Sequence, residues 1–156
     1  MRIKIISLIK RQQELLKALE EDYLKRIRKS LSCEVIEIKR EAIFKKQDQQ
    51  KILQTELKKL RNYLKENGVF VVLDSKGKEY NSQELADWLK DRIREGEREL
   101  VFVIGGPLGL SEELTKNARW CLSLSKLTFP HKLVRVLLLE TLYRSLEIGK
   151  GGSYHK

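Results

Sequence analysis

The sequence predicts an α/β fold with a mainly parallel β-sheet flanked by helices, in a single domain that spans residues 1–156. Two observations lead to this prediction. Segments with a strand pattern alternate with segments of helical period along the whole chain. Two of the strand segments, 69–74 and 100–106, are continuous apolar runs, which are typical of parallel strands buried on both faces. A length of 156 residues is that of one domain.

The first half of the chain predicts two strands and two helices. A strand at 2–8 precedes a charged helix at about 11–30, whose inner face is marked by Leu16, Leu19, Tyr23 and Ile27. A half-exposed strand begins at Cys33, because apolar and charged residues alternate there. The next helix, at about 47–66, ends at Asn67-Gly68 and carries one apolar stripe, formed by Leu53, Leu57, Leu60 and Leu64.

The second half continues this alternation. Residues 75–78 predict a turn after the strand at 69–74, and Asn81 or Ser82 is suited to cap the helix that follows. The inner face of that helix is formed by Leu85, Trp88, Leu89 and Ile93. After the strand at 100–106 we expect a short helix at 111–117, a strand at 119–125 and a last helix at 130–147. This last helix is apolar on most faces, so it is expected to be buried in its own core or against a second copy.

The charge of the chain indicates an anionic partner. A formal net charge of +10 attracts polyanions. Nucleic acid is the favoured partner, an anionic membrane surface is the competing one, and a basic surface without a special partner is the third interpretation. No segment approaches the roughly 20 apolar residues of a membrane span. The first ten residues are too short and too alternating for a secretory signal, so we expect a cytoplasmic protein.

Cysteines and histidines are too few and too scattered to predict a metal site. Cys33 and Cys121 lie far apart and are expected to be reduced, buried thiols. His131 and His155 have no metal-ligand spacing. We therefore expect no metal.

Three segments follow the ends of predicted strands, where ligands bind in open α/β sheets: 73–74, 105–109 and 124–129. The G-G-x-x-G pattern beginning at Gly105 fits a ligand-binding loop and a tight turn equally well. A dinucleotide-binding Rossmann site needs an acidic residue about 20 positions beyond the glycines. Ser125 stands in that region with no carboxylate beside it, which argues against a dehydrogenase.

Three sequence motifs carry a family resemblance: VVLD at 71–74, FVIGGPLGLS at 102–111 and LSLSKLTFPHKLVRVLLLETLYR at 122–144. The closing SYHK at 153–156 agrees with them. The chain resembles the SPOUT class of RNA methyltransferases, and within it the ribosomal large-subunit pseudouridine N3-methyltransferase (RlmH) family. The resemblance spans the whole length, although the first half contributes little motif evidence. Leu108 departs from it, because relatives often carry a polar residue there.

The resemblance implies a C-terminal trefoil knot and a homodimer that uses the last helix. It also implies binding of S-adenosyl-L-methionine, with no metal. Carried over by motif, the cofactor contacts fall on Leu73, Gly105, Leu124, Ser125, Lys126, Leu127, Thr128 and Phe129. For Leu73 and Leu127 the plain alternative is a role as core leucines.

The implied reaction methylates N3 of a pseudouridine in 23S ribosomal RNA of the assembled ribosome. That imide nitrogen must lose a proton, so a group has to accept the proton or stabilise its loss. The tentative catalytic residues, on the substrate side, are His131, Arg144, Tyr154 and His155. The dipole at the start of the last helix favours a neutral His131, which could equally be a packing residue. Cationic Arg144 or Lys126 could stabilise the uracil anion instead.

Contact with RNA is expected from basic side chains near the site. The basic residues from 129 onward are Lys132, Arg135, Arg144, Lys150 and Lys156. Two alternatives remain open at this point. One is a non-catalytic ribosome-binding or assembly factor, which should have lost the cofactor loops. The other is a SPOUT enzyme that acts on transfer RNA.

Overall fold

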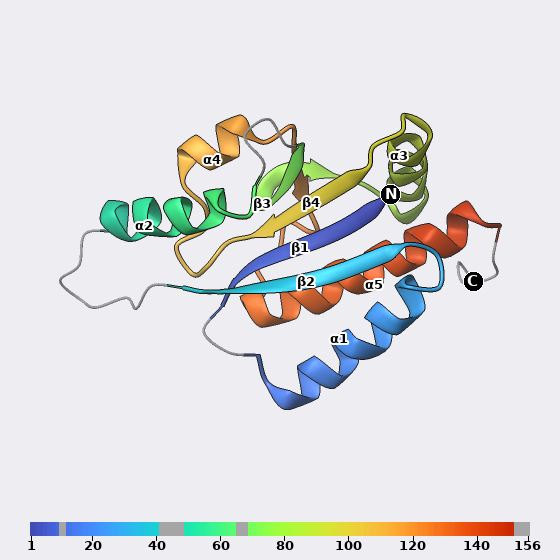
Figure 1. The fold of residues 1–156 in the computed structure, drawn as a ribbon, viewed down its shortest axis with the longest axis horizontal. Coiled ribbons are helices and arrows are strands. Elements are labelled where there is room, and N and C mark those ends of the chain that lie inside the picture. Colours follow the sequence, from blue (N-terminus) through green and yellow to red (C-terminus); the bar gives the residue numbers. More distant parts are fainter. Residues whose placement is uncertain (10–11, 41–48, 65–68, 152–156) are drawn as a thin grey trace.

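A five-stranded parallel sheet forms the centre of the molecule (Figure 1). The computed structural model describes residues 1–9, 12–40, 49–64 and 69–151. Every pair of neighbouring strands is parallel, and the strand order is β2-β1-β4-β3-β5. The strands are β1 (Arg2–Ile9), β2 (Ser32–Lys39), β3 (Phe70–Glu79), β4 (Glu99–Ile104) and β5 (Trp120–Ser123). The predicted α/β class is therefore confirmed.

Helices cover both faces of the sheet. Helices α1 (Glu14–Ile27), α3 (Ser82–Arg94) and α5 (His131–Gly149) share one apolar cluster with the sheet. Helices α2 (Gln49–Arg61) and α4 (Glu112–Asn117) belong to the cluster on the opposite face. Figure 1 shows α1 and α5 below the sheet and α2 and α4 above it. Among the described residues, no helix is long and apolar enough to cross a lipid bilayer.

The strand register brings three strand ends together at one edge of the sheet. Leu73 at the end of the regular β3 ladder pairs with Ile104 of β4 on one side and with Leu122 of β5 on the other. Strand β3 therefore lies between β4 and β5, and the chain segments that follow these positions emerge side by side. This edge is where ligands are expected to bind in a parallel sheet.

Helix α1 differs from its prediction at one position of the inner face. Its buried residues are Glu20, Leu24 and Ile27, whereas Leu19 is 43% exposed. The expectation that Leu19 lies inside is therefore wrong. A charged residue, Glu20, occupies that side of the helix because an arginine of α5 neutralises it, as described below.

Strand β3 continues where the sequence predicts a turn. Residues 75–78 belong to the strand, which resumes its pairing with β5 after an irregularity between Leu73 and Lys78. A Cβ atom at Gly77 would lie 2.7 Å from backbone atoms of Cys121 and Leu122. The glycine that suggests a turn in the sequence thus permits a close backbone contact between β3 and β5.

Helix α3 starts as predicted, and α5 buries seven of its nineteen residues against its own chain. The Asn81 side chain accepts a hydrogen bond from the Glu84 amide, and the Glu84 carboxylate accepts one from the Asn81 amide. Leu85 and Leu89 of α3 are buried, but Ile93 is 43% exposed, contrary to expectation. Helix α5 packs against α1, α3 and the sheet. The predicted stop at 67–68 lies outside the described residues.

We predict that Gly77→Ala destabilises the fold by about 1–3 kcal/mol, because the new methyl group meets backbone that cannot move aside like a flexible side chain. Urea unfolding followed by circular dichroism measures the change. Gly149→Ala is the matched control, since no atom lies within 4 Å of the place that its methyl group would take and alanine favours the helix. Equal stability of the two variants would contradict the close approach.

Candidate functional site

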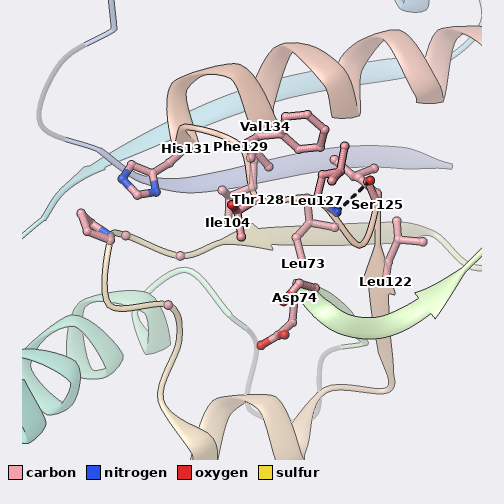
Figure 2. A pocket seen from close by; sticks show the side chains of 16 residues that line it. Leu73, Asp74, Ile104, Leu122, Ser125, Leu127, Thr128, Phe129, His131 and Val134 are labelled. Atoms are coloured by element: carbon pink, nitrogen blue, oxygen red, sulfur yellow. Dashed lines mark hydrogen bonds between the residues drawn. The ribbon is translucent and has the colours of Figure 1, made fainter.

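The carboxyl ends of β4 and β5, together with residues 73–75 of β3, where the regular β3 ladder ends, surround a cavity of about 400 Å³ (Figure 2). Its volume lies in the range of small-ligand pockets. Seven of the eight predicted cofactor residues line it: Leu73, Gly105, Leu124, Ser125, Leu127, Thr128 and Phe129. Lys126 is exposed and is not among the lining residues. Ile104, Leu122 and Val134 add apolar wall.

The glycine-rich segment forms a tight turn that is also a wall of the cavity. The Gly109 amide donates a hydrogen bond to the Gly106 carbonyl at 2.9 Å, and Gly109 has a φ of +76°. A Cβ atom at Gly105 would lie 2.6 Å from the Gly109 carbonyl oxygen. Gly105 therefore has no room for a side chain. Leu108, the departure from the family pattern, is half-buried and does not line the cavity.

The segment after β5 is shaped by its serines. The Ser123 hydroxyl donates to the Ser125 carbonyl at 3.0 Å. The Ser125 hydroxyl accepts from the Leu127 amide at 3.0 Å (Figure 2). These bonds curl the chain over the cavity and leave Leu127 70% exposed at its rim. The alternative of a core leucine is thereby excluded for Leu127. An exposed apolar side chain beside a cavity is suited to covering a bound ligand.

Among the predicted catalytic residues that the structure describes, His131 is the one that lines the cavity. It is the first residue of α5 and is half-buried. Burial lowers the pKa of its imidazole, and the positive charge of Arg40 lowers this pKa further. Both effects disfavour the imidazolium, so the ring is neutral at pH 7 and able to accept a proton.

Of the other predicted catalytic residues, the structure describes Arg144 alone, and Arg144 does not line the cavity. Arg144 lies thirteen residues beyond His131 on α5, which corresponds to about 20 Å along the helix axis. Its guanidinium donates to Glu140, one turn earlier, at 2.6 Å. Tyr154 and His155 lie outside the described residues. The roles of these three residues stay predictions.

Asp74 is a lining residue that the sequence reasoning did not single out. Its carboxylate follows Leu73, and its Oδ1 accepts a hydrogen bond from the Lys76 amide at 2.9 Å. Among the described residues that line the cavity, it is the only acidic one, and no lysine or arginine lines it. The signal in the sequence was an acidic residue directly after a continuous apolar run.

A buried ion pair anchors the start of α5. Arg135 is 1% exposed; its Nε donates to Glu20 of α1 at 2.6 Å, and its Nη2 donates to Glu37 of β2 at 2.8 Å. The Gln12 side chain donates a hydrogen bond to the Glu20 carboxylate. It also donates one to the Lys132 carbonyl, at 3.2 Å. The expectation that Arg135 contacts RNA is therefore wrong, because its guanidinium is enclosed by carboxylates.

Neither cysteine is suited to nucleophilic chemistry. Burial raises the pKa of the Cys33 thiol to about 12. Burial also raises the pKa of Cys121, and the negative charge of Asp74 adds to that shift. Both cysteines are free, and Cys33 is buried as expected, while Cys121 is half-buried. Within the part of the chain that the structure describes, no three His, Cys, Asp or Glu side chains gather as metal ligands.

The fold is that of a class of methyltransferases. A family model described as "Predicted SPOUT methyltransferase" matches residues 1–155. The chain therefore belongs to the SPOUT methyltransferase family. The trefoil knot is a property of that family.

Similar proteins within this family share one name. A protein of Caldicellulosiruptor saccharolyticus named "Ribosomal RNA large subunit methyltransferase H" is 40% identical, and the match covers 99% of each chain. Proteins with the same name from Acetivibrio thermocellus and Clostridium novyi are 39% and 38% identical, over 100% of each chain. The family that the sequence motifs indicated is thus confirmed.

We predict that the pKa of His131 is lower than that of a solvent-exposed histidine. The Arg40→Met substitution should raise this pKa part of the way toward the usual histidine value. Removing a nearby positive charge makes protonation easier, while burial still opposes it. NMR titration of the imidazole C–H resonances measures both values, and His131→Gln identifies the signal. A His131 pKa at or above the usual value would contradict the described environment.

We predict that Glu20→Gln costs about 3 kcal/mol of unfolding free energy, because it leaves the buried Arg135 without its main counter-charge. Glu147→Gln is the control, since the Glu147–Lys150 pair is solvated and worth less than about 1 kcal/mol. Urea unfolding measures both. Similar small losses in the two variants would show that the buried pair does not hold α1 to α5.

Proposed function

We propose that this chain transfers a methyl group from S-adenosyl-L-methionine to N3 of a pseudouridine in 23S ribosomal RNA of the assembled ribosome. The observation that carries the proposal is the convergence of Leu73, Gly105 and five of the six residues 124–129 on one cavity, which lies where the regular β3 ladder and strands β4 and β5 end. Support for the RNA substrate comes from the relatives, whose names describe methylation of large-subunit ribosomal RNA.

The cavity suits the proposed cofactor in size and in chemistry. Apolar walls from Leu73, Leu122 and Leu124 fit the flat face of an adenine. The backbone of 105–109 and 124–129 brings amide and carbonyl groups to the same space, and these can bind the adenine edge and the amino-acid end. The absence of a side chain at Gly105 lets the 105–109 turn close against the end of β4 beside the cavity.

The bound sulfonium would supply the methyl group, and its sulfur would keep the electron pair of the broken bond. The remaining work falls to the protein: it positions the uracil, excludes water and handles the N3 proton. Neutral His131 at the cavity wall is suited to accept that proton. Lys126, exposed on the segment that covers the cavity, is suited to stabilise the uracil anion.

A homodimer would complete the site. Arg144 is about 20 Å along α5 from His131, so a contribution to this cavity requires a second copy of the chain. Tyr154 and His155 are proposed to reach the partner's cavity in the same way. Leu133 of α5 and Leu127 at the rim are exposed apolar side chains that an interface would cover. The net charge of +10 favours RNA as the macromolecular partner, and ribosomes place the activity in the cytoplasm.

We predict that the purified chain binds S-adenosylmethionine in a calorimetric titration and that Gly105→Ala abolishes binding, because its methyl group would displace the Gly109 carbonyl. Gly149→Ala serves as the control and should bind like the unmodified chain. Incubation with ribosomes lacking the modification, followed by mass spectrometry of the RNA, should then locate the methyl group on a pseudouridine.

Three outcomes would contradict the proposal. A folded chain that does not bind S-adenosylmethionine would favour a non-catalytic ribosome-binding factor. Methyl transfer to transfer RNA alone would change the substrate. Unimpaired binding by folded Gly105→Ala would move the cofactor away from this cavity.

A further inference from the structure

The cavity has a charge distribution that its apolar motif residues do not explain. Asp74 is the only acidic side chain among the described lining residues, lysine and arginine are absent from that lining, and His131 is neutral. The carboxylate is half-buried. Figure 2 shows it at the β3 end of the cavity, well apart from the His131 imidazole. The cavity therefore carries one net negative charge in a protein whose net charge is +10.

The charge is held in place, and no basic side chain among the described residues neutralises it through an ion pair. Oδ1 accepts the hydrogen bond from the Lys76 amide, which fixes the carboxylate at the end of the regular β3 ladder. Among the residues that the structure describes, no basic side chain forms a salt bridge with Asp74. Its field extends to β5, where it acts on the Cys121 thiol. A half-buried, unpaired carboxylate attracts a cation more strongly than a fully solvated one.

The ligand expected near this carboxylate is the methyl donor of the proposed function, on which the role of Asp74 rests. S-adenosylmethionine carries a sulfonium cation, and its demethylated product, S-adenosylhomocysteine, carries a neutral thioether in its place. The two molecules are otherwise alike, so the apolar walls and backbone groups of the cavity contact both in the same way. The methyl group itself changes only the volume of the ligand by a small amount. A larger difference in affinity between the two ligands requires a charged group near the sulfur.

We propose that Asp74 is a specificity-determining residue that makes the cavity prefer the cationic methyl donor over the neutral product. The preference has a consequence for turnover. Once the methyl group has left, the attraction between the carboxylate and the sulfur position is lost, and the product is held by shape and backbone contacts alone. Asp74 thus favours exchange of product for donor without any movement of the fold.

The test is a calorimetric comparison of both ligands with the full-length chain and with Asp74→Asn. Asparagine keeps the shape and the acceptor for the Lys76 amide but removes the charge. We expect the variant to bind S-adenosylmethionine about tenfold more weakly, the size of a lost charge interaction in a half-solvated site. Binding of S-adenosylhomocysteine should change by no more than about twofold. Glu79→Gln, exposed on the same strand and outside the lining, should change neither affinity.

A second measurement shows that the variant is folded and has lost the charge. Thiol titration should give Cys121 a lower pKa in Asp74→Asn than in the unmodified chain, because the carboxylate that raises this pKa is gone. Equal losses of affinity for both ligands, or no loss for either, would overturn the role of Asp74 while leaving the proposed function intact. Failure of the unmodified chain to bind S-adenosylmethionine would instead overturn the proposed function itself.

Discussion

The structure depends on two places where backbone lies directly against backbone. At Gly77, β3 touches β5, and at Gly105, the end of β4 touches the turn that closes at Gly109; in both places a Cβ atom would come within 2.7 Å of main-chain atoms. These contacts bring the segments after three parallel strands close enough to enclose one cavity. Side chains at these two positions would hold the segments apart. Two glycines that look like ordinary loop residues in the sequence therefore determine the shape of the site.

A second constraint comes from the helices that cover the sheet. Arg135, Glu20 and Glu37 join α5, α1 and β2 through charge-assisted hydrogen bonds. Gln12 extends the network to the first turn of α5, where His131 lines the cavity. The position of His131, the only candidate base among the described residues, is therefore tied to Gln12 and Glu20, which lie more than a hundred positions earlier in the chain. A charge network of this kind fixes one arrangement of the helix, since breaking it would leave a buried charge unpaired.

Pattern in the sequence was informative wherever one physical effect dominated. Continuous apolar runs predicted β3 and β4, and the Asn81 cap was readable because its partner, Glu84, lies three residues away. Long-range effects were not readable. Nothing near Gly77 indicates β5, so this residue was read as part of a turn. Nothing near Glu20 indicates Arg135, so the buried ion pair between them was not predicted. Asp74 was passed over because the family motif contributes its neighbour, Leu73; its importance emerges only when the other lining residues prove to be uncharged.

A crystal structure of the chain grown with S-adenosylhomocysteine would test most directly whether the cavity formed by residues 73–75 of β3 and the segments after β4 and β5 holds the methyl donor. We expect ligand density between the 105–109 turn and the 124–129 segment, with apolar contacts to Leu73 and Leu124. Density elsewhere, such as the groove of about 220 Å³ between α3 and the end of α5, with this cavity unchanged, would contradict that placement.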